Sequence, residues 1–193
     1  MNELNYILNY FKSNLLVSSP DIFAFCALYF LCFKRRWREM GKRVFVLNTL
    51  LYFYNVVVFF FTLMPIISAL PRIFDHPYTM MHMIPFDDLS LGRGGAVVQL
   101  ILNMALTIPF GFLLSARIDE KRFAFLKTVG YTVCLSLFIE LLQPLLDGFR
   151  SSDITDVIIN TVGGALGFPI YKSIKALYRN YATRIEKNNE SQR

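Results

Sequence analysis

The sequence has few charged residues for its length. Of 193 residues, 18% are charged and 54% are hydrophobic. That is too little charge to cover the surface of a soluble domain of this size, so the composition predicts one integral membrane domain over residues 1–193. The formal net charge of +6 lies in a few short runs. This pattern predicts loops at a membrane surface and no nucleic-acid partner.

The sequence also lacks the common motifs of metal, nucleotide and hydrolase sites. Its cysteines lie in apolar stretches without metal-ligand spacing, which predicts reduced packing residues: Cys26, Cys32 and Cys134. His76 and His82 share residues 65–95 with several aspartates, but their spacing fits no standard site, so neither a metal nor a cofactor is expected. A Walker loop, a dinucleotide fingerprint, GxSxG and HExxH are all missing. ATP-driven transport and the common hydrolase chemistries therefore have no sequence support.

Long apolar segments are present instead. A helix needs about 20 residues to cross the hydrocarbon core, and residues 44–64 and 96–116 run that far without a charge. Residues 124–146 and 157–177 are two further spans, the latter with lysines that can snorkel outward. Residues 18–33 are the fifth, with Ser18 as a hydroxyl cap, Pro20 in the first turn and Asp21 near the positive end of the helix dipole. The sequence predicts an all-α, polytopic membrane protein with about five transmembrane helices.

Basic residues predict the orientation of these spans, because Lys and Arg stay on the cytoplasmic side of a membrane. The first loop is KRRWREMGKR, the third carries Arg117, Lys121 and Arg122, and the segment after the last span is again basic. The other side receives residues 65–95 and the short loop 147–156. This alternation predicts the N-terminus outside and the C-terminus inside, with residues 178–193 as a polar basic cytoplasmic tail.

Polar residues interrupt the last three spans at a similar depth. At ~1.5 Å per residue, Asn103, Glu140 and Asn160 each lie roughly 10 Å below the predicted outer surface. A carboxylate costs at least ~2.5 kcal/mol at the bilayer centre, so Glu140 is expected to face protein or water. Gly163 and Gly167 form a small-residue face that allows close approach to a neighbouring helix. The sequence thus predicts a polar pocket that opens to the outer face.

Two features in this region have alternative interpretations. Pro109 and Gly111 are expected to interrupt the helix below Asn103, which by itself fits interhelical hydrogen bonding. Asp153 and Asp156 follow Ser151-Ser152 and fit either the pocket or the ordinary acidic first turn of a helix, with Arg150 as a surface counter-ion. Glu140 with Gln143 favours function, because interhelical contacts seldom use a carboxylate.

The order and spacing of three motifs resemble the VanZ-like family of small bacterial membrane proteins. The motifs are MHMIPF, LILNMALTIPFGFLL and SLFIELLQPLLDGFRSSDITDVIINTVGGALG, all within residues 84–167 apart from the first three letters. The family pattern runs PF, N-x(5)-P-x-G, E-x-x-Q, R-x-x-D-x-x-D and N-x-x-G. It matches this sequence at Pro85, Phe86, Asn103, Pro109, Gly111, Glu140, Gln143, Arg150, Asp153, Asp156, Asn160 and Gly163.

The resemblance implies a multi-pass protein of the bacterial cytoplasmic membrane, associated with resistance to glycopeptide antibiotics of the teicoplanin type. One hypothesis is binding of an amphiphile in contact with membrane lipid, either a lipid-linked cell-wall precursor or the lipoglycopeptide itself. The alternative is an enzyme that acts on a lipid headgroup, with Glu140 and Asp156 as acid–base residues. The predicted ligand-binding set is Asn103, Glu140, Gln143, Arg150, Asp153, Asp156 and Asn160.

Overall fold

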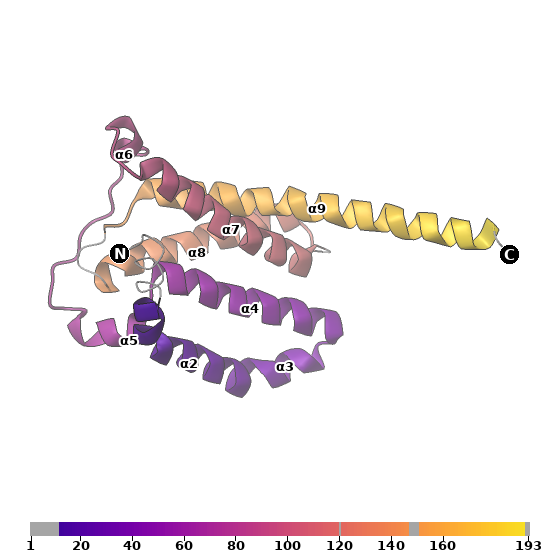
Figure 1. The fold of residues 1–193 in the computed structure, drawn as a ribbon, viewed down its shortest axis with the longest axis horizontal. Coiled ribbons are helices and arrows are strands. Elements are labelled where there is room, and N and C mark those ends of the chain that lie inside the picture. Colours follow the sequence, from indigo (N-terminus) through magenta and orange to yellow (C-terminus); the bar gives the residue numbers. More distant parts are fainter. Residues whose placement is uncertain (1–11, 120, 147–150, 192–193) are drawn as a thin grey trace.

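The computed structural model describes residues 12–119, 121–146 and 151–191, and within them the chain is helical, without a β-strand (Figure 1). The predicted all-α fold is confirmed. Four helices are long and apolar enough to cross a membrane. They are α4 (Lys42–Thr62), α7 (Ala96–Ile118), α8 (Ala124–Leu146) and α9 (Ile154–Ser191).

The segment predicted as the first span is not among these four, because its helix is divided. Helix α2 (Ser19–Leu28) passes into a π-helical turn, η1 (Tyr29–Phe33), and then into the basic helix α3 (Lys34–Glu39). The predicted hydroxyl cap is wrong, since the side chain of Ser18 makes no capping hydrogen bond. Residues 12–17 are also helical, and a turn at Ser18 separates them from α2, so the predicted helix start is confirmed although its hydroxyl cap is not.

Asp21 stabilises a different helix from the one predicted. Its buried carboxylate accepts the backbone N–H groups of Ile66 (3.0 Å) and Ile67 (2.8 Å). These groups open the short helix α5 (Ile66–Ala69), whose first N–H groups have no partner within the helix. Asp21 therefore fastens α2 to the chain that follows α4.

The long connection between α4 and α7 contains three short helical pieces. After α5 come η2 (Leu70–Arg72) and α6 (Asp87–Ser90).

Hydroxyl groups join the first segment to α4. Tyr29 and Thr49 are hydrogen-bonded at 2.9 Å, and Tyr52 donates to the carbonyl of Phe25 at 2.7 Å. The divided first segment thus lies along α4 (Figure 1).

Helices α7 and α9 make the most extensive helix–helix contact in the fold, followed by α8 with α9. A Cβ atom on Gly111 would meet the backbone of Gly164, and one on Gly167 would meet the backbone of Ile108 and Phe112. The predicted small-residue face on the last span is confirmed. The predicted interruption of α7 is wrong, because the helix runs through Pro109 and Gly111 to Ile118.

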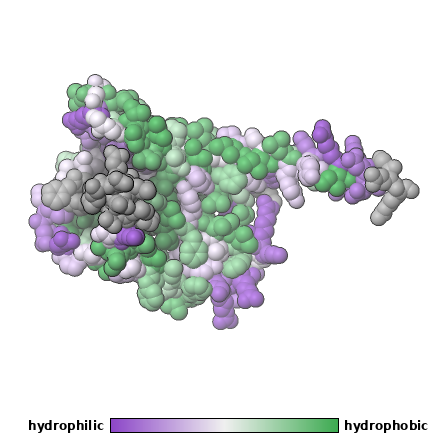
Figure 2. Space-filling view, in the orientation of Figure 1, coloured by the Kyte–Doolittle hydropathy of each residue, from purple (hydrophilic) through white to green (hydrophobic). Residues whose placement is uncertain are grey.

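Helix α9 has 38 residues and projects well past the other helices at its C-terminal end (Figure 1). Residues 178–191, the first part of the predicted tail, continue this helix. Figure 2 shows mostly hydrophobic side chains over the middle of the bundle, with hydrophilic ones toward the ends and on the projecting part of α9. This distribution suits a protein whose central belt faces lipid.

The glycine contact between α7 and α9 predicts a sharp difference between two alanine substitutions. Gly111→Ala should lower the free energy of unfolding by about 1–3 kcal/mol, because the added methyl group meets backbone that cannot move aside. Gly130→Ala is the matched control, since a Cβ atom there meets nothing within 4 Å. Thermal unfolding of the purified proteins in detergent measures both. Equal midpoints for the two variants would contradict the close α7–α9 contact.

Candidate functional site

The loop before α7 is attached to the start of α9 through backbone hydrogen bonds. His82 N–H donates to the carbonyl of Ser152 at 2.9 Å, and Ile154 N–H donates to the carbonyl of His82 at 3.0 Å. Farther along the loop, Phe86 N–H donates to the hydroxyl of Thr155 at 2.9 Å. The MHMIPF segment is therefore held beside the first turn of α9, although about 70 residues separate them in the sequence.

Asp153 has the structural role that the simpler interpretation assigned to it. Its carboxylate accepts the N–H of Thr155 at 2.7 Å, which satisfies one of the unpaired donors at the start of α9. Its own N–H donates to Glu140 Oε2 at 2.9 Å. The hydroxyl of Ser152 donates to the backbone carbonyl of Glu140. The end of α8 and the start of α9 are thus joined by two polar contacts, both made by Glu140.

Glu140 faces protein rather than lipid, as predicted. The residue is 2% exposed, and its carboxylate accepts a backbone N–H from the neighbouring helix start. A buried carboxylate without such partners would be strongly unfavourable. Glu140 therefore positions the beginning of α9.

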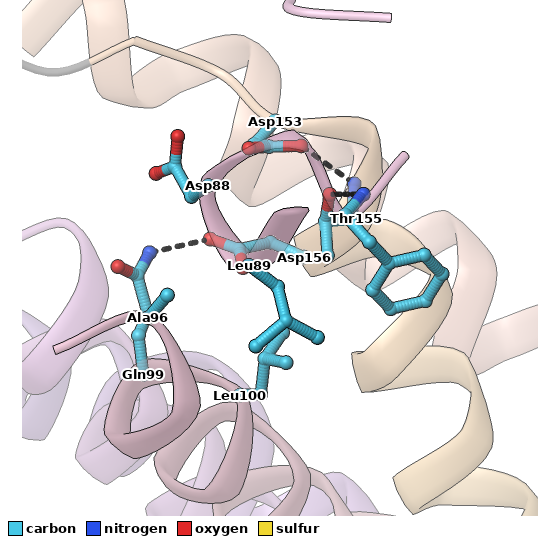
Figure 3. Close-up of a pocket in the computed structure, with 9 residues that line it drawn as sticks. Asp88, Leu89, Ala96, Gln99, Leu100, Asp153, Thr155 and Asp156 are labelled. Atoms are coloured by element: carbon cyan, nitrogen blue, oxygen red, sulfur yellow. Dashed lines mark hydrogen bonds between the residues drawn. The ribbon is translucent and has the colours of Figure 1, made fainter. Parts of the chain in front are cut away.

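Asp156 has a different environment. Gln99 Nε2 donates to Asp156 Oδ2 at 3.1 Å (Figure 3), and the side chain of Asn103 is a second hydrogen-bonding neighbour. Gln99 lies one helical turn before Asn103, so both amides occupy the same face of α7. The Asp156 carboxylate is thus bound by side chains of another helix.

Gln99 and Asp156 border a hollow of about 20 Å³ between α6, α7 and α9 (Figure 3). Its polar lining comes from Asp88, Gln99, Asp153, Thr155 and Asp156. That volume suits one water molecule, so a larger group would have to contact these residues from the exposed side, where Gln99 lies. We call Gln99, Asn103, Asp153, Thr155 and Asp156 the polar cluster.

His82 lies beside the polar cluster, which the sequence did not predict. Its Nε2 is 3.5 Å from Asp87 Oδ2, and its Nδ1 is 4.0 Å from Asp153 Oδ2. Gln99 was also missed, although its spacing of four residues from Asn103 was an available signal.

The other predicted site residues contact different parts of the bundle. Gln143 donates to the carbonyl of Thr62 at the end of α4 (3.2 Å), and Asn160 donates to the hydroxyl of Ser136 on α8 (2.9 Å). Neither they nor Glu140 line the hollow beside Asp156. Arg150 lies outside the described residues. The single cavity expected from the sequence therefore stays a prediction.

In the part of the chain that the structure describes, no group of three or more His, Cys, Asp and Glu side chains is arranged to hold a metal ion. The chemistry on offer in the polar cluster is that of hydrogen-bond acceptors, namely two carboxylates and the amide oxygens beside them. Such a set favours a partner that carries hydroxyl, amide or ammonium donors.

Comparison with known proteins gives a consistent result. The sequence matches the VanZ/LLP1 family over residues 22–176, which extends well beyond the motifs at residues 84–167. It is 32% identical over 132 residues to Protein VanZ of Enterococcus faecium, covering 68% of this chain and 76% of that protein. No solved structure matches the chain.

The contact between Glu140 and Asp153 predicts an order of stability among variants. Glu140→Ala leaves the N–H of Asp153 without its acceptor and should cost about 1–3 kcal/mol of unfolding free energy. Glu140→Gln keeps a carbonyl oxygen in the same place and should cost less. Unfolding of both variants in detergent, measured beside the parent protein, tests this order. A Gln variant as unstable as the Ala variant would show that the charge matters rather than the acceptor.

Proposed function

The chain belongs to the VanZ/LLP1 family, and on that premise we propose that it binds an amphiphilic ligand through the polar cluster in the bacterial cytoplasmic membrane. This binding would contribute to resistance against glycopeptide antibiotics of the teicoplanin type. The fold supports a membrane protein, since four of its helices are long and apolar enough to span a bilayer.

The environment of Asp156 carries this proposal. The carboxylates of Asp153 and Glu140 both accept backbone N–H groups at the start of α9, so they have a structural role. Asp156 instead meets the amides of Gln99 and Asn103 beside the hollow. Side chains can turn toward a ligand without unfolding a helix end. Asp156 is therefore the carboxylate best placed to exchange its partners for those of a ligand.

The proposed ligand combines hydrogen-bond donors with an apolar part. Asp153 and Asp156 would accept from its hydroxyl, amide or ammonium groups, and Arg150, close by in the sequence, would take a phosphate or carboxylate with its planar fork of donors. Asn103 completes the proposed set, whereas Gln143 and Asn160 contact other parts of the bundle and would support the site indirectly. A lipid-linked cell-wall precursor and the lipoglycopeptide both have this mixed character.

The second candidate is an enzyme that uses Glu140 and Asp156 as acid and base on a lipid headgroup. The burial of Glu140 and its bond to a backbone N–H disfavour that role, because a general base must reach the proton that it abstracts. Of the two proposed acid–base residues, Asp156 borders the hollow and Glu140 does not. Binding is therefore the function that we prefer, and the enzyme becomes one outcome of the test.

We further propose five membrane crossings, with the first segment as the additional one, the N-terminus outside and the C-terminus inside. The basic residues of the α3–α4 turn and of the α7–α8 loop support this orientation. The polar cluster would then face the outer side of the membrane, where it could contact a cell-wall precursor or an antibiotic.

This orientation predicts the location of three reporter fusions. Reporters after Arg193 and within residues 117–122 should both report the cytoplasm, whereas one beside Asp87 should report the outside, because positive loops are retained inside. Paired alkaline phosphatase and fluorescent protein fusions measure this directly. An outside C-terminus would place the polar cluster on the cytoplasmic face and remove the proposed access to external ligands.

The role of Asp156 predicts that Asp156→Asn abolishes protection while the protein still accumulates. The substitution keeps the size of the side chain and removes its charge. A hydrogen bond to a charged group contributes about 1.5–3 kcal/mol, so binding should weaken roughly tenfold to a hundredfold. Teicoplanin susceptibility of cells carrying the full-length variant, normalised to membrane abundance, measures the loss.

Asp75→Asn is the matched control, because Asp75 is an exposed residue of the long connection between α4 and α7 that does not line the hollow, and the substitution removes the same charge. It should leave protection unchanged. Protection by Asp156→Asn at equal abundance would show that the polar cluster is not the site. If the purified variant still binds the antibiotic or a cell-wall lipid but gives no protection, Asp156 has a catalytic role instead.

A further inference from the structure

A second cavity lies at the end of the bundle opposite the polar cluster. Its volume is about 190 Å³, compared with about 20 Å³ for the hollow beside Asp156. The two cavities lie at opposite ends of helix α7, which has 23 residues and a length of about 35 Å at ~1.5 Å per residue. The lining residues are Arg43, Val44 and Leu47 from the start of α4 and Arg117, Asp119 and Lys121 around the end of α7.

Among the described residues that line this cavity, positive charges outnumber negative ones. Three of its lining residues are cations and one, Asp119, is an anion. The carboxylate of Asp119 is 3% exposed and forms ion pairs with Lys172 and Lys175 on α9. Burial would raise the pKa of Asp119, but the hydrogen bonds from the two lysines together outweigh it and lower the pKa to about 2. Its negative charge is therefore matched by lysines outside the lining.

Arg117 is held in position within this cavity. Its Nε donates to Asn48 Oδ1 at 2.6 Å, which fixes the plane of the guanidinium group against α4. The terminal nitrogens remain as a planar pair of donors, the geometry that suits two oxygens of a phosphate. Among the described residues, neither Arg117 nor Lys121 forms an ion pair.

The cavity also has an apolar part. Val44 and Leu47 lie one turn apart on α4 and line it beside the cations. Basic pockets between helix ends at a membrane surface are suited to anionic headgroups, because the charge meets the phosphate while neighbouring apolar side chains meet the first carbons of the lipid.

We propose that this cavity binds the phosphate ester of an anionic lipid headgroup, with Arg117 and Lys121 as the phosphate contacts and Val44 and Leu47 against the glycerol and upper acyl carbons. The site is independent of the polar cluster and of the ligand proposed there. In the proposed orientation it faces the cytoplasmic leaflet, where anionic lipids meet basic loops.

The test uses the full-length protein purified in detergent, with phosphatidylglycerol, phosphatidylcholine and soluble glycerol phosphate as probes. Phosphatidylglycerol should raise the unfolding midpoint more than phosphatidylcholine does, and native mass spectrometry should show it retained. Lys121→Gln should weaken this binding roughly tenfold, the effect of losing one charge-assisted contact. Lys121 is exposed, so this variant should still fold.

Arg117→Lys keeps the charge and removes the planar fork, and it should also weaken binding of phosphatidylglycerol. Arg184→Gln is the matched control, since it removes one charge from the projecting, exposed part of α9, and it should bind like the parent. Equal stabilisation by phosphatidylcholine, or equal weakening by Arg184→Gln, would overturn the site. Equal stabilisation by glycerol phosphate would show that the ligand is a soluble phosphate ester and not a lipid.

Discussion

Direct backbone contact between helices α7 and α9 is the constraint on which both ends of the molecule depend. Gly111 and Gly164 meet without side chains between them, and Gly167 meets the backbone of the same turn of α7, at Ile108 and Phe112. In a bilayer, where lipid is as apolar as a leucine side chain, such close packing replaces the hydrophobic effect as the source of helix association. At one end it brings Gln99 to Asp156. At the other it brings Asp119 to Lys172 and Lys175.

The second requirement is that polar groups buried within the apolar bundle find partners. The hydroxyls of Thr128 and Thr132 on α8 donate to carbonyls one turn earlier in their own helix. Thr128 can therefore face Ser115 of α7, and Thr132 can face Gly164 of α9, without an unpaired donor. Glu140 meets this requirement with the first residues of α9. The hydrogen bond from the N–H of Asp153 offsets part of the free-energy cost of burying the Glu140 carboxylate. It also fixes where α9 begins, and with it the position of Asp156.

The two ends of α7 therefore differ in chemistry. The end at Gln99 offers carboxylates and amide oxygens beside a hollow that suits one water molecule. The end at Arg117 offers cations and apolar side chains around a cavity nearly ten times larger. Acceptors at one membrane surface and donors at the other suit an amphiphile on one side and an anionic headgroup on the other. Each proposed site is tested separately, since neither shares a residue with the other.

Several features could be predicted from the sequence alone. Residues 124–146 coincide with α8, Gly163 and Gly167 lie at a close helix contact, and Glu140 is buried with a polar partner. Each follows from a local rule: the length needed to cross a bilayer, small residues four apart, and the cost of a carboxylate in lipid.

Only the tertiary structure determined which group each polar side chain contacts. Asp21 binds α5, Gln143 binds the end of α4, and His82 lies between Asp87 and Asp153. Periodicity gives the face of a helix on which a residue lies, but the group across from it depends on how distant segments are placed, and that is settled only when the helices pack.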